Sequence, residues 1–141
     1  MEQHEKIELS KARLERAQEF LKASIDNADN GNYLTSVNRS YYAAYFAIRA
    51  LLILEHIEMV KHSGNISEYR RHYIKAGIFK KEFSGYLSSL FQCRQDSDYD
   101  PMFVITKNEV LTQLEHAKEI VSEIAAYLNE RYDLLSQIEN N

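Results

Sequence analysis

Apolar residues recur every three or four positions along four long segments of the chain, which is the spacing of one face of an α-helix. The first of these segments covers residues 5–28. Its apolar stripe consists of Ile7, Leu14, Ala17, Leu21, Ile25 and Ala28. The sequence Asp29-Asn30-Gly31-Asn32 predicts the end of this helix, because Gly and Asn tolerate the left-handed backbone conformation of a helix C-cap.

The second segment predicts a helix from about residue 33 to His56. Residues 41–54 are apolar almost all round, which is typical of a central bundle helix that is covered on several sides. Tyr41 stands one turn before Tyr45 in this stretch. We interpret these tyrosines as core and interface residues whose hydroxyls are satisfied at the edge, rather than as catalytic groups.

The middle of the chain has a weaker pattern. Residues 57–66 contain a glycine and lose the periodicity, so we expect a connection there, followed by a short helix over residues 67–75. Another helix begins at Phe83, and we expect a loop over residues 96–105. Thr106-Lys107-Asn108-Glu109 has the form of a capping box, which predicts the start of the last long helix.

Together these segments predict an all-α fold, an antiparallel bundle of four main helices plus a short extra helix. A length of 141 residues suits one domain, residues 1–141, with a core over about residues 5–135. Four glycines and one proline are too few for a β-sandwich rich in tight turns.

Composition narrows the environment. Cys93 is the only cysteine, so no internal disulfide is possible and a reducing cytoplasm is expected. The N-terminal sequence is too charged for a signal peptide, and the longest apolar segment is too short to span a bilayer. We therefore expect a cytoplasmic protein without a membrane partner. The net charge of −4 argues against a surface wholly dedicated to nucleic acid, although it allows a local basic patch.

A candidate site lies where the Phe83 helix ends. Phe83, Leu87 and Leu90 form one apolar stripe, and the next residue on that stripe is Arg94. A guanidinium on a core-facing stripe is costly to desolvate unless an acid or an anion meets it. Asp98 and Tyr99 follow one turn later, before Pro101. The alternative is a structural clamp, in which Arg94 pairs with Asp98 or Asp96 and anchors the loop.

The densest basic stretch follows the predicted connection. It contains Arg70, Arg71 and Lys75, with aromatic residues between them. Basic groups interleaved with aromatic rings can hold a phosphodiester backbone and stack bases, so we expect these three residues to bind RNA. A solvated helix face is the alternative explanation for such a run.

No motif indicates a metal or a cofactor. One cysteine and five histidines without ligand spacing make a metal site improbable. There is no P-loop, no Rossmann glycine pattern and no recurring Glu-x-x-His pair. We therefore expect neither a metal nor a cofactor.

Four motifs occur in an order that resembles the small prokaryotic HEPN-domain proteins. They are NRSYYAAYFAIRALL (38–52), KHSG (61–64), IKAGIF (74–79) and CRQDSDYD (93–100). The resemblance covers roughly residues 8–130. It implies a helical bundle that commonly forms a homodimer. It also implies pairing with a minimal nucleotidyltransferase, in a toxin–antitoxin arrangement whose HEPN chain cleaves RNA.

The catalytic motif of that family is an arginine, four to six residues, and then a histidine. Arg94 matches its arginine, but Tyr99, Asp100 and Pro101 stand where the histidine belongs. Metal-free RNA cleavage needs a base, an acid and a cation. Histidine serves as acid or base near neutral pH, whereas tyrosine, with a pKa of about 10, is a poor base. His62 or His72 is a candidate to complete the site from another element.

The same resemblance implies a second possible role for Tyr99. In some of these pairs the nucleotidyltransferase adenylylates a tyrosine next to the motif and silences the toxin. Tyr99 is therefore either a residue on the substrate side of the site or the candidate adenylylation site.

Two functional classes remain open. The first is a toxin-like protein that binds and cleaves RNA without metal. In it, Arg94 contacts the scissile phosphate, Asp98 and Tyr99 assist, and the basic stretch grips the backbone. The second is a non-catalytic HEPN module that binds a nucleotide or a partner protein. The absent motif histidine favours the second class, and the resemblance as a whole favours the first.

Overall fold

The computed structural model describes residues 1–55 and 58–139, and the described part of the chain contains no strand. Its elements are α1 (Gln3–Asp29), α2 (Tyr33–Glu55), α3 (His62–Tyr69), a π-helical turn η1 (Arg70–Ile74), α4 (Glu82–Tyr99) and α5 (Lys107–Glu139). The predicted all-α bundle of four main helices and a short extra one is confirmed.

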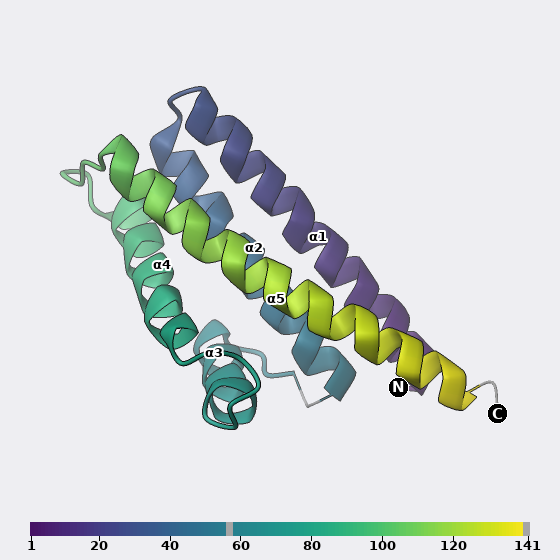
Figure 1. The fold of residues 1–141 in the computed structure, drawn as a ribbon. Coiled ribbons are helices and arrows are strands. Elements are labelled where there is room, and N and C mark those ends of the chain that lie inside the picture. The colour runs from purple at the N-terminus through teal and green to yellow at the C-terminus, as the bar shows by residue number, and fades with distance from the viewer. Residues whose placement is uncertain (56–57, 140–141) are drawn as a thin grey trace.

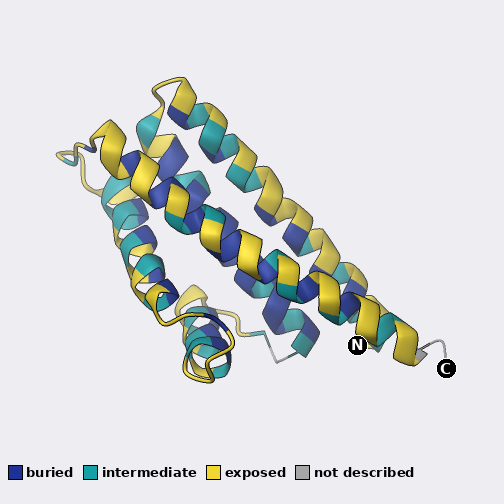
Figure 2. Ribbon diagram, viewed as in Figure 1, coloured by how far each residue is buried: buried dark blue, intermediate teal, exposed yellow. Residues whose placement is uncertain are grey.

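The four long helices run alternately up and down, so that the N- and C-termini lie at the same end of the bundle (Figure 1). Helix α2 packs against α1, α3, α4 and α5, which makes it the central helix. Its nearly continuous apolar surface explains this position, because a helix that is hydrophobic on every side must be covered on every side. Buried residues follow α2 between its neighbours, whereas α1 and α5 turn exposed faces outward (Figure 2).

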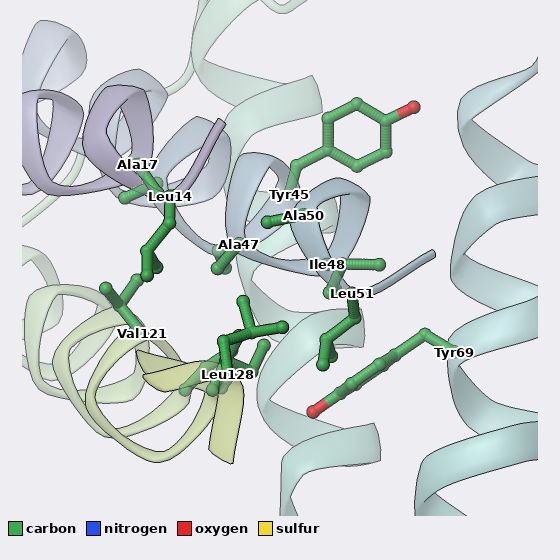
Figure 3. Close-up of a cluster of buried hydrophobic side chains, with 14 of the residues drawn as sticks. Leu14, Ala17, Tyr45, Ala47, Ile48, Ala50, Leu51, Tyr69, Val121 and Leu128 are labelled. Atoms are coloured by element: carbon green, nitrogen blue, oxygen red, sulfur yellow. The ribbon is translucent and has the colours of Figure 1, made fainter. Parts of the chain in front are cut away.

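One large core joins all the helices. Leu14 of α1, Leu51 of α2 and Leu128 of α5 converge on it together with Tyr69 of α3 (Figure 3). The stripe predicted on α4 is also part of this core, because Phe83, Leu87 and Leu90 are almost completely buried.

Local signals explain the ends of most helices. Gly31 has a φ of 77° after α1, which is the left-handed conformation predicted there. Thr106 accepts a hydrogen bond from the Glu109 backbone N–H at 3.2 Å, so it caps α5 as predicted. Helix α2 is described as far as Glu55, and His56 lies outside the described residues.

Two predicted boundaries are wrong. Helix α3 begins at His62, inside the predicted connection, because tertiary bonds organise this weakly patterned segment. The buried Asn65 side chain accepts from the Met59 backbone N–H at 2.8 Å and donates to the Tyr45 hydroxyl at 2.8 Å. Helix α4 continues through Tyr99 instead of ending at Asp96, and Gln92 donates to the Asp96 carboxylate across its last turns.

Candidate functional site

Arg94 lies at the end of the buried stripe of α4, against aromatic rings. The residue is only 8% exposed. Its guanidinium carbon is 4.8 Å from the centre of the Tyr41 ring, 5.7 Å from Tyr42 and 5.6 Å from Phe91. Aromatic faces stabilise a cation by their quadrupole, but they do not neutralise its charge or accept all of its hydrogen bonds.

The acid that faces Arg94 is only loosely paired with it. The Nη1 atom of Arg94 lies 3.5 Å from Oδ2 of Asp98, and the same oxygen accepts from Asn38 Nδ2 at 3.3 Å. The buried Nε of Arg94 has no hydrogen-bond partner within the described part of the chain. The predicted clamp geometry is therefore present, but it leaves much of the donor capacity of Arg94 unused.

A cavity of about 400 Å³ opens beside this cluster, between α3 and α4. Two of the rings around Arg94, Tyr41 and Phe91, form part of its wall. The remaining lining residues are His62, Ser63, Ile66, Ser67, Arg70, Leu87, Ser88 and Gln92. An apolar floor with hydroxyls, an imidazole and a guanidinium around it is the usual composition of a small-molecule or nucleotide-binding site.

Tyr41 carries a second unused polar group into this cluster. Its side chain is fully buried, and its hydroxyl has no hydrogen-bond partner among the described residues. Burial raises its pKa to about 12, against the opposing charge of Arg94. The hydroxyl is therefore protonated at neutral pH. The prediction that these tyrosine hydroxyls are satisfied is confirmed for Tyr45, which accepts from Asn65, and is wrong for Tyr41.

His62, the first residue of α3, is the histidine that borders the cavity. Its ring centre lies 4.1 Å from that of Tyr45 and 6.1 Å from that of Tyr42. His62 is exposed overall, but the partial desolvation of its ring lowers its pKa below the ordinary histidine value, and the positive charges of Arg94 and Arg49 lower it further. No hydrogen bond joins His62 to Arg94 in the described structure, so any shared action needs a ligand between them.

Tyr99 ends α4 and stands apart from this cluster. Its side chain is 71% exposed, and it makes no hydrogen bond or ring contact within the described ranges 1–55 and 58–139. The structure thus brings Arg94 and Asp98 together, whereas Tyr99, the residue after Asp98, is exposed to solvent.

The predicted basic residues take different positions. Arg70 donates to Ser84 Oγ at 2.9 Å, to the Ser84 carbonyl at 3.0 Å and to Ser88 Oγ at 2.8 Å, which ties the π-helical turn to α4. Arg70 also borders the cavity. Arg71 and Lys75 are exposed and do not line it.

Sequence reasoning did not single out Phe91, and it predicted neither the hydrogen bond from Asn38 to Asp98 nor the unpaired hydroxyl of Tyr41. Phe91 precedes Arg94 by three residues, so helical periodicity was a usable signal that the two share a face. The contacts made by Asn38 and Tyr41 join α2 to α4, and no local pattern predicts them.

For metal ligands, Glu2, His4 and Glu5 form the one group of at least three such side chains found among the described residues. All three are exposed at the start of α1, where Glu2 is the N-cap residue and His4 and Glu5 lie in the first turn. Exposed acidic groups at a helix start are common without any ion, so this group indicates no metal site. No helix in the described ranges has both the length and the apolarity needed to cross a membrane.

The fold is a helical bundle with a cavity between α3 and α4, and Arg94 lies behind two of the rings, Tyr41 and Phe91, that line this cavity. The sequence matches the HEPN domain family model over residues 10–130. The chain therefore belongs to the HEPN domain family.

Curated relatives agree with this assignment. A protein of Methanocaldococcus jannaschii named "Putative toxin" is 29% identical over 140 residues, which cover 99% of this chain and 95% of the relative. A UPF0332 protein of Thermotoga maritima is 28% identical over 109 residues, covering 77% of this chain and 83% of that protein. A second M. jannaschii protein named "Putative toxin" is 27% identical over 88 residues, or 62% of this chain and 66% of the relative.

Proposed function

We propose that this chain is a toxin-like HEPN protein that binds RNA and cleaves it without metal, and that a nucleotidyltransferase antitoxin silences it. The similarity to two relatives named as toxins supports the biological class. The observation that carries the chemistry is the state of Arg94. It is a buried guanidinium with one loose acidic partner and an unpaired Nε, next to an open cavity.

A phosphodiester suits the environment of Arg94. Charge-assisted bonds to a phosphate use several guanidinium donors at once, and they become stronger where water is excluded. The same cation stabilises the extra negative charge that develops on phosphorus when a ribose 2′-oxygen attacks it. Asp98 orients the guanidinium. Arg71 and Lys75 provide exposed positive charge for phosphates further along the RNA backbone.

The test is cleavage of a labelled single-stranded RNA in the presence of EDTA. The wild-type chain is expected to cut, and Arg94→Ala and Arg94→Lys are expected to lose most of the activity, because lysine lacks the planar fork of donors. Arg16→Ala is the matched control, since Arg16 is an exposed arginine of α1 that pairs with Glu19 at 3.5 Å on the solvent side. A wild-type chain that cuts no RNA, with its helical circular-dichroism spectrum intact, rules out this function.

The proposed silencing step acts on Tyr99. Its exposed phenol at the end of α4 is accessible to an adenylyl-transferring partner. Intact mass after incubation with the cognate nucleotidyltransferase and ATP is expected to rise by one or more AMP groups, and not to rise for Tyr99→Phe. An equal gain in mass by the Tyr99→Phe variant places the modification elsewhere.

A second candidate function is a non-catalytic module that binds a nucleotide, without cleaving RNA. The cavity volume of about 400 Å³ favours it, because ligand sites of this kind begin at roughly 300 Å³. Calorimetric titration with AMP and ATP, on the wild type and Arg94→Ala, distinguishes the two functions when combined with the cleavage assay. The homodimer expected for this family is tested in the same samples by light scattering.

A further inference from the structure

The HEPN histidine motif is not completed in this chain, so a cleavage site built on Arg94 needs a base from elsewhere. The histidines that the structure describes differ in their access to the site. His4 lies on the first turn of α1. His116 of α5 stacks on Tyr86 of α4, with the ring centres 4.0 Å apart, and does not line the cavity. His72 pairs with Glu68 at 2.8 Å on the π-helical turn. Of these histidines, His62 is the one that lines the cavity beside Arg94.

His62 and Arg94 both lie against tyrosine rings of α2, and both contact Tyr42. The imidazole centre lies 6.1 Å from the Tyr42 ring and the guanidinium carbon lies 5.7 Å from the same ring. His62 lines the cavity from α3, while Tyr41 and Phe91, the other rings against Arg94, line it from α2 and α4. A ribose bound in this cavity would contact the imidazole of His62. Its 3′-phosphate would approach Arg94 past the rings of Tyr41 and Phe91, which lie between the guanidinium and the cavity.

We propose that His62 is a catalytic residue of this chain, the general base that takes the proton of the ribose 2′-hydroxyl. This inference rests on the RNA-cleaving function proposed above. It replaces a base supplied four to six residues after Arg94 by one supplied from the start of α3.

The step balances in atoms and electrons. The unprotonated imidazole nitrogen accepts the 2′-hydroxyl proton while the 2′-oxygen forms a bond to phosphorus, and the bond between phosphorus and the 5′-oxygen breaks. The departing 5′-oxygen takes a proton from a water molecule, and the proton held by His62 neutralises the hydroxide that remains. The products are a 2′,3′-cyclic phosphate and a free 5′-hydroxyl, with no oxidant, metal or cofactor consumed.

The charges around His62 suit a base. Arg49 and Arg94 face it from α2 and α4, and Arg70 borders the same cavity beyond α3. Tyr42 and Tyr45 are the titratable rings packed on it from α2, and burial holds the pKa of Tyr45 above its usual value, so that ring stays neutral. Although His62 is exposed overall, partial desolvation of its ring and the charges of the two arginines lower its pKa, which favours the unprotonated imidazole at neutral pH.

The alternatives in the same cluster suit this role less well. The phenol of Tyr41, with a pKa raised to about 12, does not release its own proton at neutral pH and so cannot begin as a base. Asp98 lies against Arg94 and Asn38 and does not line the cavity, and Tyr99 is exposed at the end of α4. These observations leave the imidazole of His62 as the group with the right proton affinity at the cavity wall.

The experiment measures metal-free RNA cleavage by the wild type, His62→Gln, His62→Ala and the control His116→Gln. His116 is a matched control because burial also lowers its pKa, while its ring lies in a different surface region with Tyr86. We expect His62→Gln to lower kcat/KM by about 100-fold or more, the usual contribution of a general base. The His116→Gln variant should keep the wild-type rate.

Two readouts distinguish a base from a residue that merely supports the fold. The acidic limb of the wild-type pH–rate profile should titrate at the pKa of His62, measured independently by NMR, and it should be absent from His62→Gln. Free imidazole in the buffer should restore part of the activity of His62→Ala but none of that of Arg94→Ala. Thermal unfolding shows whether each variant is folded.

The outcomes separate this inference from the proposed function. If wild type and His62→Gln cut equally well with the same pH profile, His62 is not the base, and the ribonuclease function stands. If the wild type cuts no RNA, both are overturned. If His62→Gln loses activity but keeps the acidic limb in its residual rate, and imidazole restores nothing, His62 acts only through the fold and the inference is also overturned.

Discussion

Among the residues that the structure describes, buried polar groups are hydrogen-bonded in one interface of the central helix α2 and unpaired in another. Between α1 and α2, the buried Ser24 hydroxyl is hydrogen-bonded to the Ser36 carbonyl at 2.8 Å and to Ser40 Oγ at 2.6 Å. The buried Ser10 donates to the Ala50 carbonyl at 2.7 Å in the same interface. Between α2 and α4, the Tyr41 hydroxyl and the Arg94 Nε are buried and have no partner in the described structure.

We interpret this difference as support for the ligand site proposed on the α2–α4 side. A buried polar group without a partner costs roughly 1–3 kcal/mol, so an interface made only for stability avoids it. The α1–α2 side follows this rule. The α2–α4 side departs from it next to a cavity whose wall includes Tyr41 and Phe91.

The largest expected effect is the loss of stability from a substitution in the core, compared with a substitution at the cavity wall. Leu51→Ala, at a fully buried position of α2, should lower the free energy of unfolding by about 2–5 kcal/mol because it leaves a cavity. Phe91→Ala should cost less, about 1 kcal/mol, since 41% of Phe91 is already exposed. Urea unfolding measures both. An equal loss in the two variants would mean that Phe91 belongs to the stabilising core.

The next largest effect compares two hydroxyls of the same helix. Tyr45→Phe removes the acceptor of the buried Asn65 amide and should destabilise the protein by about 1–3 kcal/mol. Tyr41→Phe removes a hydroxyl that bonds to nothing in the described structure and should leave stability unchanged within about 0.5 kcal/mol. A destabilisation by Tyr41→Phe as large as that by Tyr45→Phe would contradict the contrast between the interfaces. Denaturant titration at one pH gives both values.

A smaller effect is expected when the charge of Arg94 is removed. Arg94→Met removes the stabilising contacts between the cation and the rings, but it also removes the energetic cost of burying a poorly paired charge. The two effects oppose each other, so the free energy of unfolding should change by no more than about 1 kcal/mol. RNA cleavage should be lost in the same sample. If Arg94→Met unfolds several degrees lower than the wild type, the ion pair with Asp98 is a stabilising clamp.

The smallest effect is a dependence of stability on pH. Burial lowers the pKa of both His62 and His116 in the folded protein, so the unfolded chain binds more protons than the folded one just below the ordinary histidine pKa of about 6.5. Their contribution to stability is complete above that value and is lost as the pH falls through the lowered pKa values. The melting temperature should therefore be lower at pH 5 than at pH 7.5. His62→Gln/His116→Gln should reduce that difference, and an unchanged difference would assign it to other groups.

Sequence patterns predicted the long helices well because each needs only local information. The stripe from Phe83 to Arg94 is buried as its spacing predicts, and the Thr106 cap lies where its motif places it. The weaker predictions concern residues 62–66 and 96–99. There the helices are held by contacts such as that between Asn65 and Tyr45, which join segments 20 residues apart.

Local patterns in the sequence are enough to predict a helical bundle with α2 at its centre and a buried arginine near the end of α4. Periodicity and the cost of exposing apolar surface are enough for that result. The surroundings of the arginine, in contrast, are set by the tertiary packing: the rings of Tyr41 and Tyr42, the loosely held Asp98 and the nearby cavity that includes His62. These groups come from three helices, and their distances depend on how the helices pack, which no local pattern encodes.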